Sequence, residues 1–285
     1  MAHINMIDKT KMPNTSSSLA EDMKALGIKG GDILIVHASL SSIGWTLGGA
    51  TAVVSALLNV VTEKGTIAMP AFSLENSDPA IWGPFPPKTN EIPRGQLMPH
   101  PVPEGWFDFI RENMPPYNKH ITPCSKGLGI IAECFRTFPN TLRSNHPSAS
   151  FTANGLHAEK IIENHPLTPN FGLNSPLGML YKLNAKILMI GTNYDKNTSF
   201  HFAEDRCGIF PKVTHSGAVM EKGERKWINY ENYDSIIENF IPMGIACEEN
   251  NLVHKGKIGQ ANCKLLDMKK TVDFCVNWLK RGMDK

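Results

Sequence analysis

Short apolar runs alternate with amphipathic stretches along the first third of the chain. Residues 32–37 and 66–70 are mostly apolar and each run follows glycine, a pattern that is typical of buried strands. Between them, residues 50–61 carry apolar side chains at helical spacing. A strand, a helix and a second strand in this order favour a parallel pair, so the pattern predicts an α/β fold.

The same patterns predict the remaining elements. Helices are expected over 18–27, 103–113, 129–138, 175–183, 198–205 and 268–280, and strands over 148–153 and 186–191. Ser18 and Glu21 have the spacing of a capping box for the first helix. Residues 73–101 are rich in proline and predict a long ordered loop, and residues 219–228 predict a hairpin that turns at Lys222-Gly223.

These elements define the expected domain organisation. Residues 1–15 are expected to form a flexible leader, and residues 16–285 a single domain. The domain is predicted to have a central mixed sheet flanked by helices, with an antiparallel C-terminal elaboration.

Composition narrows the class of protein and its partners. Of the 285 residues, 41% are hydrophobic and 20% are charged, with a net charge of +2, as in ordinary globular proteins. Basic residues do not cluster with aromatic ones, so no nucleic-acid partner is expected. There is no apolar run of about 18 residues and no signal-peptide pattern, so we expect a cytoplasmic protein with no membrane partner. The six cysteines lack CxxC spacing, and therefore no disulfide framework and no metal site are expected.

Several catalytic templates are absent from the sequence. The motifs GxGxxG, GxxxxGK[ST], GxSxG and HExxH do not occur. The phosphate-binding loop of the commonest acetyl-CoA-dependent N-acetyltransferase fold is also missing. Dinucleotide enzymes, P-loop NTPases and α/β hydrolases are therefore disfavoured.

Histidines supply the most suggestive chemistry. His37 ends a predicted strand and precedes small polar residues that lead into a helix, where α/β proteins bind anions. The alternative is an ordinary strand-to-helix loop. His146 and His165 each precede proline and therefore belong to extended loops, where they either bind a ligand or hydrogen-bond a loop carbonyl.

A fourth histidine lies on a predicted helix. His201 and Glu204 are three residues apart and share one face, so they form either an acid–base pair or a structural hydrogen bond. His201 and Asp205 also spell HxxxD, which resembles the catalytic motif of another CoA-dependent acyltransferase class. That class has glycine where this chain has Arg206, so the match is weak.

An ordered series of segments resembles the aminoglycoside 3-N-acetyltransferase family. The series includes HASLSSIG at 37–44, RSNHP at 143–147 and NTSFHFAE at 197–204, together with segments at 48–50, 65–70, 150–155, 165–172, 175–178 and 188–191. The resemblance covers roughly residues 16–280. Each segment alone is weak, but their order and spacing together are specific.

The resemblance implies an α/β fold other than the common N-acetyltransferase fold, and an acetyl-CoA co-substrate. The acceptor it implies is the 3-amino group of the 2-deoxystreptamine ring of aminoglycosides, with direct transfer in a ternary complex. By motif match, His165 is the general base, and Glu204 either orients it or holds the substrate ammonium. The alternatives are an acetyl-CoA-dependent N-acetyltransferase with a different small amine acceptor, and a protein that binds CoA without turnover. The protein is expected to be a monomer or a homodimer.

The resemblance also assigns binding residues. The CoA-binding residues are expected to be His37, Ser39, Leu40, Ser41, Ser42, Ile43, Gly44, Ser148 and Phe151. Because an aminoglycoside carries several positive charges, its site is expected to be acidic, with Asp78, Asp195, Glu204 and Asp205 as candidates and Trp82 as a wall.

Overall fold

The computed structural model describes residue 7, residues 12–86 and residues 98–283. Most of the predicted leader therefore lies outside the described residues, as does part of the predicted 73–101 loop. The last leader residues are fixed in place, because Asn14 Nδ2 donates to the carbonyl of Ile43 at 3.0 Å. Thr15 and Ser18 form the capping box of helix α2 (Ser16–Ala25), so the first helix begins before the predicted Ser18 cap.

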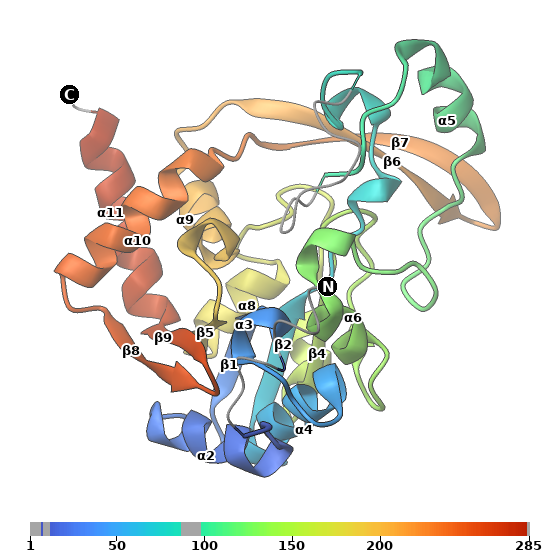
Figure 1. The fold of residues 1–285 in the computed structure, drawn as a ribbon. Helices are drawn as coiled ribbons and strands as arrows, with labels where there is room; N and C mark the ends of the chain where they lie inside the picture. The colour runs from blue at the N-terminus through green and yellow to red at the C-terminus, as the bar shows by residue number, and fades with distance from the viewer. Residues whose placement is uncertain (1–6, 8–11, 87–97, 284–285) are drawn as a thin grey trace.

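A seven-stranded mixed sheet forms the centre of the molecule, as predicted (Figure 1). Its order is β3-β4-β2-β1-β5-β9-β8. The strands are β1 (Ile33–Ala38), β2 (Thr66–Pro70), β3 (Leu142–Arg143), β4 (Phe151–Gly155), β5 (Lys186–Ile190), β8 (Val253–Ile258) and β9 (Ala261–Asp267). Strands β2, β1 and β5 are parallel, and the outer pairings are antiparallel.

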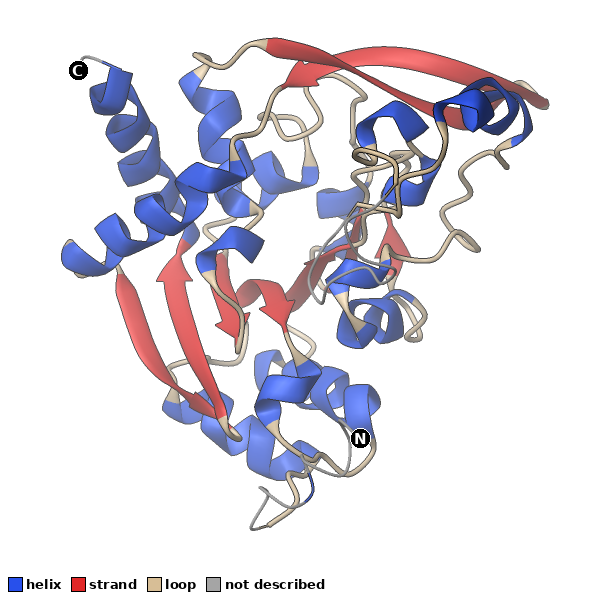
Figure 2. Cartoon of the chain, turned by 45° about the horizontal axis from the view of Figure 1, so that its top comes forward, coloured by secondary structure: helices blue, strands red, loops and turns tan. Residues whose placement is uncertain are grey.

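Helices cover both faces of the sheet (Figure 2). Leu34 and Val36 of β1 pack into one core with α2, α4 (Gly49–Val61) and α6 (Ile130–Arg136). Ile35 packs into the other core, because successive side chains of a strand point to opposite faces. The helices of that second core are α7 (Ala158–Ile162), α8 (Pro176–Lys182), α9 (Ser199–Cys207), α10 (Phe240–Glu249) and α11 (Met268–Met283).

The predicted hairpin is present and longer than expected. Strands β6 (Lys212–Glu221) and β7 (Glu224–Tyr233) form a separate two-stranded sheet that reaches across the molecule towards helix α5 (Phe107–Asn113) (Figure 1). Lys222 and Gly223 form its turn with φ values of 52° and 84°, the left-handed backbone that a two-residue hairpin turn requires.

Several elements differ from the prediction. The predicted strand at 148–153 begins at Phe151, because the preceding residues form a loop around His146. Helix α10, the edge strand β8 and its neighbour β9 occupy a region for which no element was predicted. The short helix α3 (Leu40–Ile43) follows β1, and single 3-10 turns lie at Leu74–Asn76, Pro79–Ile81, Glu104–Trp106, Lys126–Leu128, Tyr194–Lys196 and Ile237–Asn239.

Candidate active site

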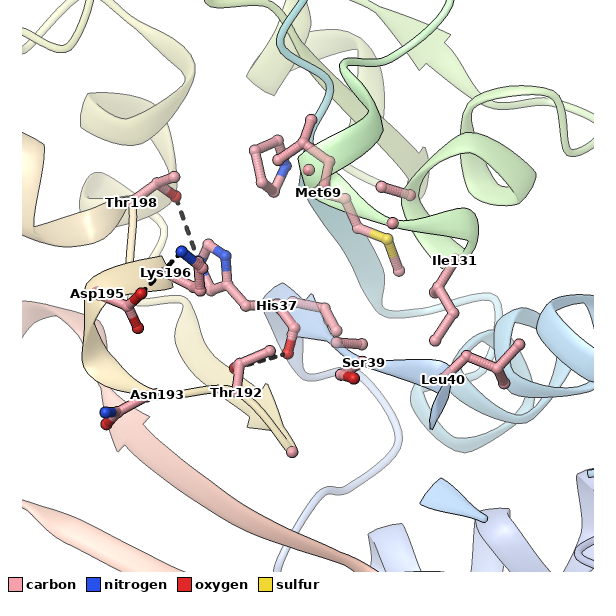
Figure 3. Close-up of a pocket in the computed structure, with 18 of the residues that line it drawn as sticks. His37, Ser39, Leu40, Met69, Ile131, Thr192, Asn193, Asp195, Lys196 and Thr198 are labelled. Carbon is pink, nitrogen blue, oxygen red and sulfur yellow. Dashed lines mark hydrogen bonds and ion pairs between the residues drawn. The ribbon is translucent and has the colours of Figure 1, made fainter. Parts of the chain in front are cut away.

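A cavity of about 840 Å³ lies at the end of the parallel strands where β1 and β5 finish (Figure 3). Its wall is formed by the end of β1 with the α3 turn, the end of β2, the 126–132 segment and the 191–198 segment, together with His201, Ile237, Phe240 and Gln260. Ligands of α/β proteins bind at this end of the sheet, because the loops there diverge to either side. Of the residues predicted from the sequence, His37, Ser39, Leu40, Ser41 and Asp195 line this cavity.

The turn after β1 is held by its own serines. Ser42 Oγ donates to the carbonyl of Gly191 at 3.1 Å and lies 3.0 Å from Ser39 Oγ, which ties the turn to the end of β5. Ile43 is fully buried in the core, and Gly44 follows with a φ of 91°. Ser42, Ile43 and Gly44 thus lie behind the cavity wall and shape the turn, while the preceding residues face the cavity.

His37 is a neutral histidine at the base of the cavity. Its side chain is buried, and its Nε2 atom lies 3.4 Å from the hydroxyl of Thr198 (Figure 3). Burial and the nearby His201 together lower the pKa of His37 to about 3. At neutral pH His37 therefore carries no charge and can only exchange hydrogen bonds with a ligand.

His201, which is partly exposed, and the buried Glu204 form a dyad on α9. His201 lines the cavity, and its Nδ1 atom lies 3.3 Å from Glu204 Oε2. The hydroxyl of Ser235 lies 2.7 Å from both atoms, and the backbone N–H of Ile236 donates to Glu204 Oε1 at 3.1 Å. Glu204 is only 2% exposed, so it supports His201 from behind and does not reach the cavity itself.

Aromatic rings fix the orientation of His201. Phe171 stacks on the imidazole at 4.7 Å with an angle of 10° between the rings, and Phe240 packs edge-on at 4.8 Å. No residue within 12–86 or 98–283 hydrogen-bonds the Nε2 atom of His201. The arrangement presents one basic nitrogen to the cavity and holds the other against a carboxylate, which suits proton abstraction.

His165 lies in a second layer, outside the cavity wall. Its Nε2 atom donates to the carbonyl of Asn170 at 2.9 Å, so its Nδ1 atom accepts from the hydroxyl of Ser144 at 2.8 Å. Packing around the ring lowers the pKa of His165 to about 4. Both nitrogens are therefore occupied within the protein, and the hydrogen bonds of Glu204 go to His201 and its neighbours, not to His165.

The loop before β4 is built around His146. The His146 Nδ1 atom accepts hydrogen bonds from the backbone N–H groups of Ser148 and Ala149, and the ring packs 4.6 Å from that of His165. The hydroxyl of Ser148 bonds to that of Tyr230 at 2.9 Å, and Phe151 is fully buried. The structure therefore brings Ser148 and Phe151 together with His146 and His165, and neither Ser148 nor Phe151 lines the cavity.

The candidate acceptor residues do not form one cluster. Asp78 accepts two hydrogen bonds from Arg111, at 3.0 and 2.9 Å, and Trp82 donates to the hydroxyl of Ser77. Asp195 lines the cavity but pairs with Lys196 at 2.7 Å. Asp205 is half-buried, forms no hydrogen bond with the described residues, and has a pKa raised to about 6 by burial.

Some site residues had no sequence signal. Ser235 lies 31 residues beyond Glu204, and nothing in its local sequence indicates the contact. Lys126 and Lys196 also line the cavity, and they follow no phosphate-binding motif. The helix predicted at 198–205 is present as α9 and places His201 beside Glu204.

The family model and the known proteins similar to this chain indicate the same family. Residues 35–280 match the model of the family described as aminoglycoside 3-N-acetyltransferase. The chain is 44% identical to the SPbeta prophage-derived aminoglycoside N(3')-acetyltransferase-like protein YokD of Bacillus subtilis, over 96% of this chain and 95% of that protein. It is 26% identical to aminoglycoside N(3)-acetyltransferase IX of Micromonospora chalcea, over the full length of both.

Solved structures agree. The crystal structure of YokD from Bacillus subtilis superposes with a TM-score of 0.91 at 42% identity, over 98% of each chain. The binary complex of AAC-IIIb with CoASH superposes with a TM-score of 0.79 at 27% identity, over 95% of this chain and 97% of that one. Within the described residues, no helix is both long and apolar enough to cross a membrane. The chain belongs to the aminoglycoside 3-N-acetyltransferase family, a family of acyltransferases.

Proposed function

We propose that the protein transfers the acetyl group of acetyl-CoA to the 3-amino group of the 2-deoxystreptamine ring of an aminoglycoside. The transfer is direct, within a ternary complex, and needs no covalent acetyl-enzyme. The observation that carries the proposal is the His201–Glu204 dyad on the cavity wall, in a chain whose family is named for this reaction. The solved complex of a relative with CoASH supports acetyl-CoA as the donor.

The motif match predicts His165 as the general base, but the geometry favours His201 for this role. An attacking ammonium must first lose a proton, and a base needs a free lone pair within reach of it. His201 has its Nε2 atom free of the described residues and its Nδ1 atom beside Glu204, whereas both nitrogens of His165 are bonded. General-base assistance of this kind is typically worth about 10²–10⁴ in rate.

The donor side of the cavity suits a CoA thioester. Leu40 and Ser41 begin helix α3, so their N–H groups have no partner within the helix and can stabilise the thioester oxygen as it becomes negative. Lys126 on the wall offers positive charge to CoA phosphates, while Lys196 is paired with Asp195. The neutral His37 at the base adds no repulsion to a cationic acceptor.

Asp205, which follows Glu204 on α9 and is not among the residues that line the cavity, is the remaining candidate carboxylate for the acceptor. Its half-buried carboxyl has no bonded partner among the described residues, and a substrate ammonium would lower its raised pKa and hold it ionised. Asp78 and Asp195 are already neutralised by Arg111 and Lys196. Because these two ion pairs leave fewer free carboxylates for a polycationic substrate, they favour a second candidate function. In that function the protein is an N-acetyltransferase whose acceptor is a smaller and less cationic amine.

The test is thiol release from acetyl-CoA with kanamycin-, gentamicin- and neomycin-type acceptors and with simple diamines. The variants are His201→Ala and His165→Ala, with the exposed His254→Ala of β8 as the matched control. We expect release with a deoxystreptamine acceptor that is lost in His201→Ala and kept in the control. Loss in His165→Ala alone would return the base to His165, and release with diamines alone would establish the second candidate.

A further inference from the structure

We propose that Ser235 is a positioning residue, whose hydroxyl links His201 to Glu204 and selects the tautomer in which His201 can act as a base. The inference rests on the proposed function, because it assigns a role within the same site. Ser235 lies after β7, on the segment that leads into α10, and comes to α9 from a distant part of the sequence. Its side chain is half-buried, so the hydroxyl is not needed to fill the core.

The distances show why a bridge is required. The direct separation of His201 Nδ1 and Glu204 Oε2 is 3.3 Å, which is long for a hydrogen bond between an imidazole and a carboxylate. The two contacts of Ser235 Oγ, to the same nitrogen and the same oxygen, are both 2.7 Å. The short path between base and carboxylate therefore passes through the hydroxyl.

Proton counting sets the direction of both bonds. An ionised carboxylate can only accept, so the single hydroxyl proton of Ser235 is donated to Glu204. The Ser235 oxygen must then accept from His201, which places a proton on Nδ1 and leaves the Nε2 lone pair free. Ser235 thus fixes the tautomer whose basic nitrogen is on the cavity side.

The neighbours of Ser235 hold it in this position. The N–H of Ile236 donates to Glu204 Oε1 at 3.1 Å, so two consecutive residues bind the two oxygens of one carboxylate. Ile237 lines the cavity, and Phe240 packs its ring edge-on against His201. The segment from 235 to 240 therefore contacts the dyad from behind and the cavity from the side.

The experiment compares Ser235→Ala with Ser235→Thr, which keeps the hydroxyl. Ser216→Ala is the matched control, because its hydroxyl also makes a 2.7 Å hydrogen bond, to Asn229 in the hairpin, away from the dyad. Steady-state thiol release gives kcat and the KM for acetyl-CoA. Nitrogen NMR of histidine-labelled protein, with the His201 signals assigned by their loss in His201→Asn, reports the tautomer directly.

We expect Ser235→Ala to lower kcat about tenfold, the equivalent of one charge-assisted hydrogen bond, with the KM for acetyl-CoA unchanged. The His201 signals should shift towards the tautomer protonated on Nε2, and Ser235→Thr should restore both properties. A kcat within about twofold of the parent, or unchanged His201 signals, would overturn the assignment. If no acceptor is turned over, the proposed function fails, but the nitrogen spectra still decide the role of Ser235 because the tautomer is set without substrate.

Discussion

Replacing Glu204 with glutamine tests the site most directly, because it changes the hydrogen-bond direction at one atom while keeping the shape of the side chain. The carboxylate accepts from the Ile236 N–H and from the Ser235 hydroxyl, and its Oε2 atom lies 3.3 Å from His201 Nδ1. A glutamine can keep its carbonyl towards Ile236 only by turning its NH₂ towards Ser235 and His201. If the amide is reversed, its NH₂ group faces the backbone N–H of Ile236, so that two donors meet.

Either orientation of the amide disfavours the productive imidazole. A buried donor facing a donor costs about 1–3 kcal/mol, which lowers the population of the tautomer with a free Nε2 lone pair by about 5- to 150-fold. Loss of the negative charge that stabilises the imidazolium during proton transfer adds to this. We therefore expect kcat in Glu204→Gln to fall by about 10²–10⁴, the usual range for general-base assistance.

The assay is acetyl-CoA thiol release at saturating acceptor, together with thermal unfolding. The KM for acetyl-CoA should stay unchanged, because Glu204 does not line the cavity. Glu248→Gln is the control, since Glu248 also accepts from a buried partner, Tyr194, and lies outside the dyad. A Glu204→Gln enzyme that keeps kcat within about threefold, or that loses only acetyl-CoA affinity, would refute the assignment of the dyad.

Three further predictions concern stability. Because the folded-state pKa of His37 is about 3, against 6.5 unfolded, the unfolded chain alone takes up this proton as pH falls below 6.5. The free energy of unfolding should then drop by up to about 1.4 kcal/mol per pH unit, and urea unfolding at about pH 5 and about pH 7.5 should show a smaller drop in His37→Asn. Arg143→Met should cost about 2–4 kcal/mol in urea unfolding, because its buried guanidinium donates to Ser150 Oγ and to the carbonyls of Thr122 and Ala71. An undiminished urea midpoint would contradict that account. Gly191→Ala should cost about 1–3 kcal/mol and raise the KM for acetyl-CoA, since its φ is 62° and a Cβ would lie 2.2 Å from that of Ser42. Gly208→Ala, which has a φ of 69° and open space around it, separates the backbone strain from the clash.

The sequence predicted those parts of the fold that are buried on both sides. Strands β1, β2 and β5 read as continuous apolar runs because both faces of the central sheet are covered by helices. The edge strand β8 has the sequence Val253-His254-Lys255-Gly256-Lys257-Ile258, and its burial is low, so it carries no such pattern. Helix α10 was not predicted because its sequence contains proline and glycine, which are unfavourable inside a helix.

In the candidate site, contacts within one helix could be predicted from the sequence, whereas contacts between distant loops could not. His201 and Glu204 were recognisable as neighbours because a helix converts a spacing of three into one face. The motif match placed the base at His165, but the sequence contains nothing that reports the hydrogen bonds from Ser144 and to Asn170 that occupy this ring. Contacts between distant loops, like that of Ser235, follow from the fold and not from local pattern.

The mixed order of the sheet has a consequence for how this enzyme can diversify. At the ends of the parallel strands, Ala38 pairs with Ile190, Pro70 pairs with Phe151 at the start of the antiparallel strand β4, and Ile190 pairs with Cys263 near the start of the antiparallel strand β9. The loop before β4 and the β8–β9 turn therefore open onto the same rim as the loops after β1, β2 and β5. Five separate connections meet at one edge, while the two helical cores lie on the faces away from it. Insertions or residue substitutions in any of these connections can reshape the acceptor-binding site without disturbing the core packing that sets stability. New amine specificities are therefore accessible while the sheet and its helices stay unchanged.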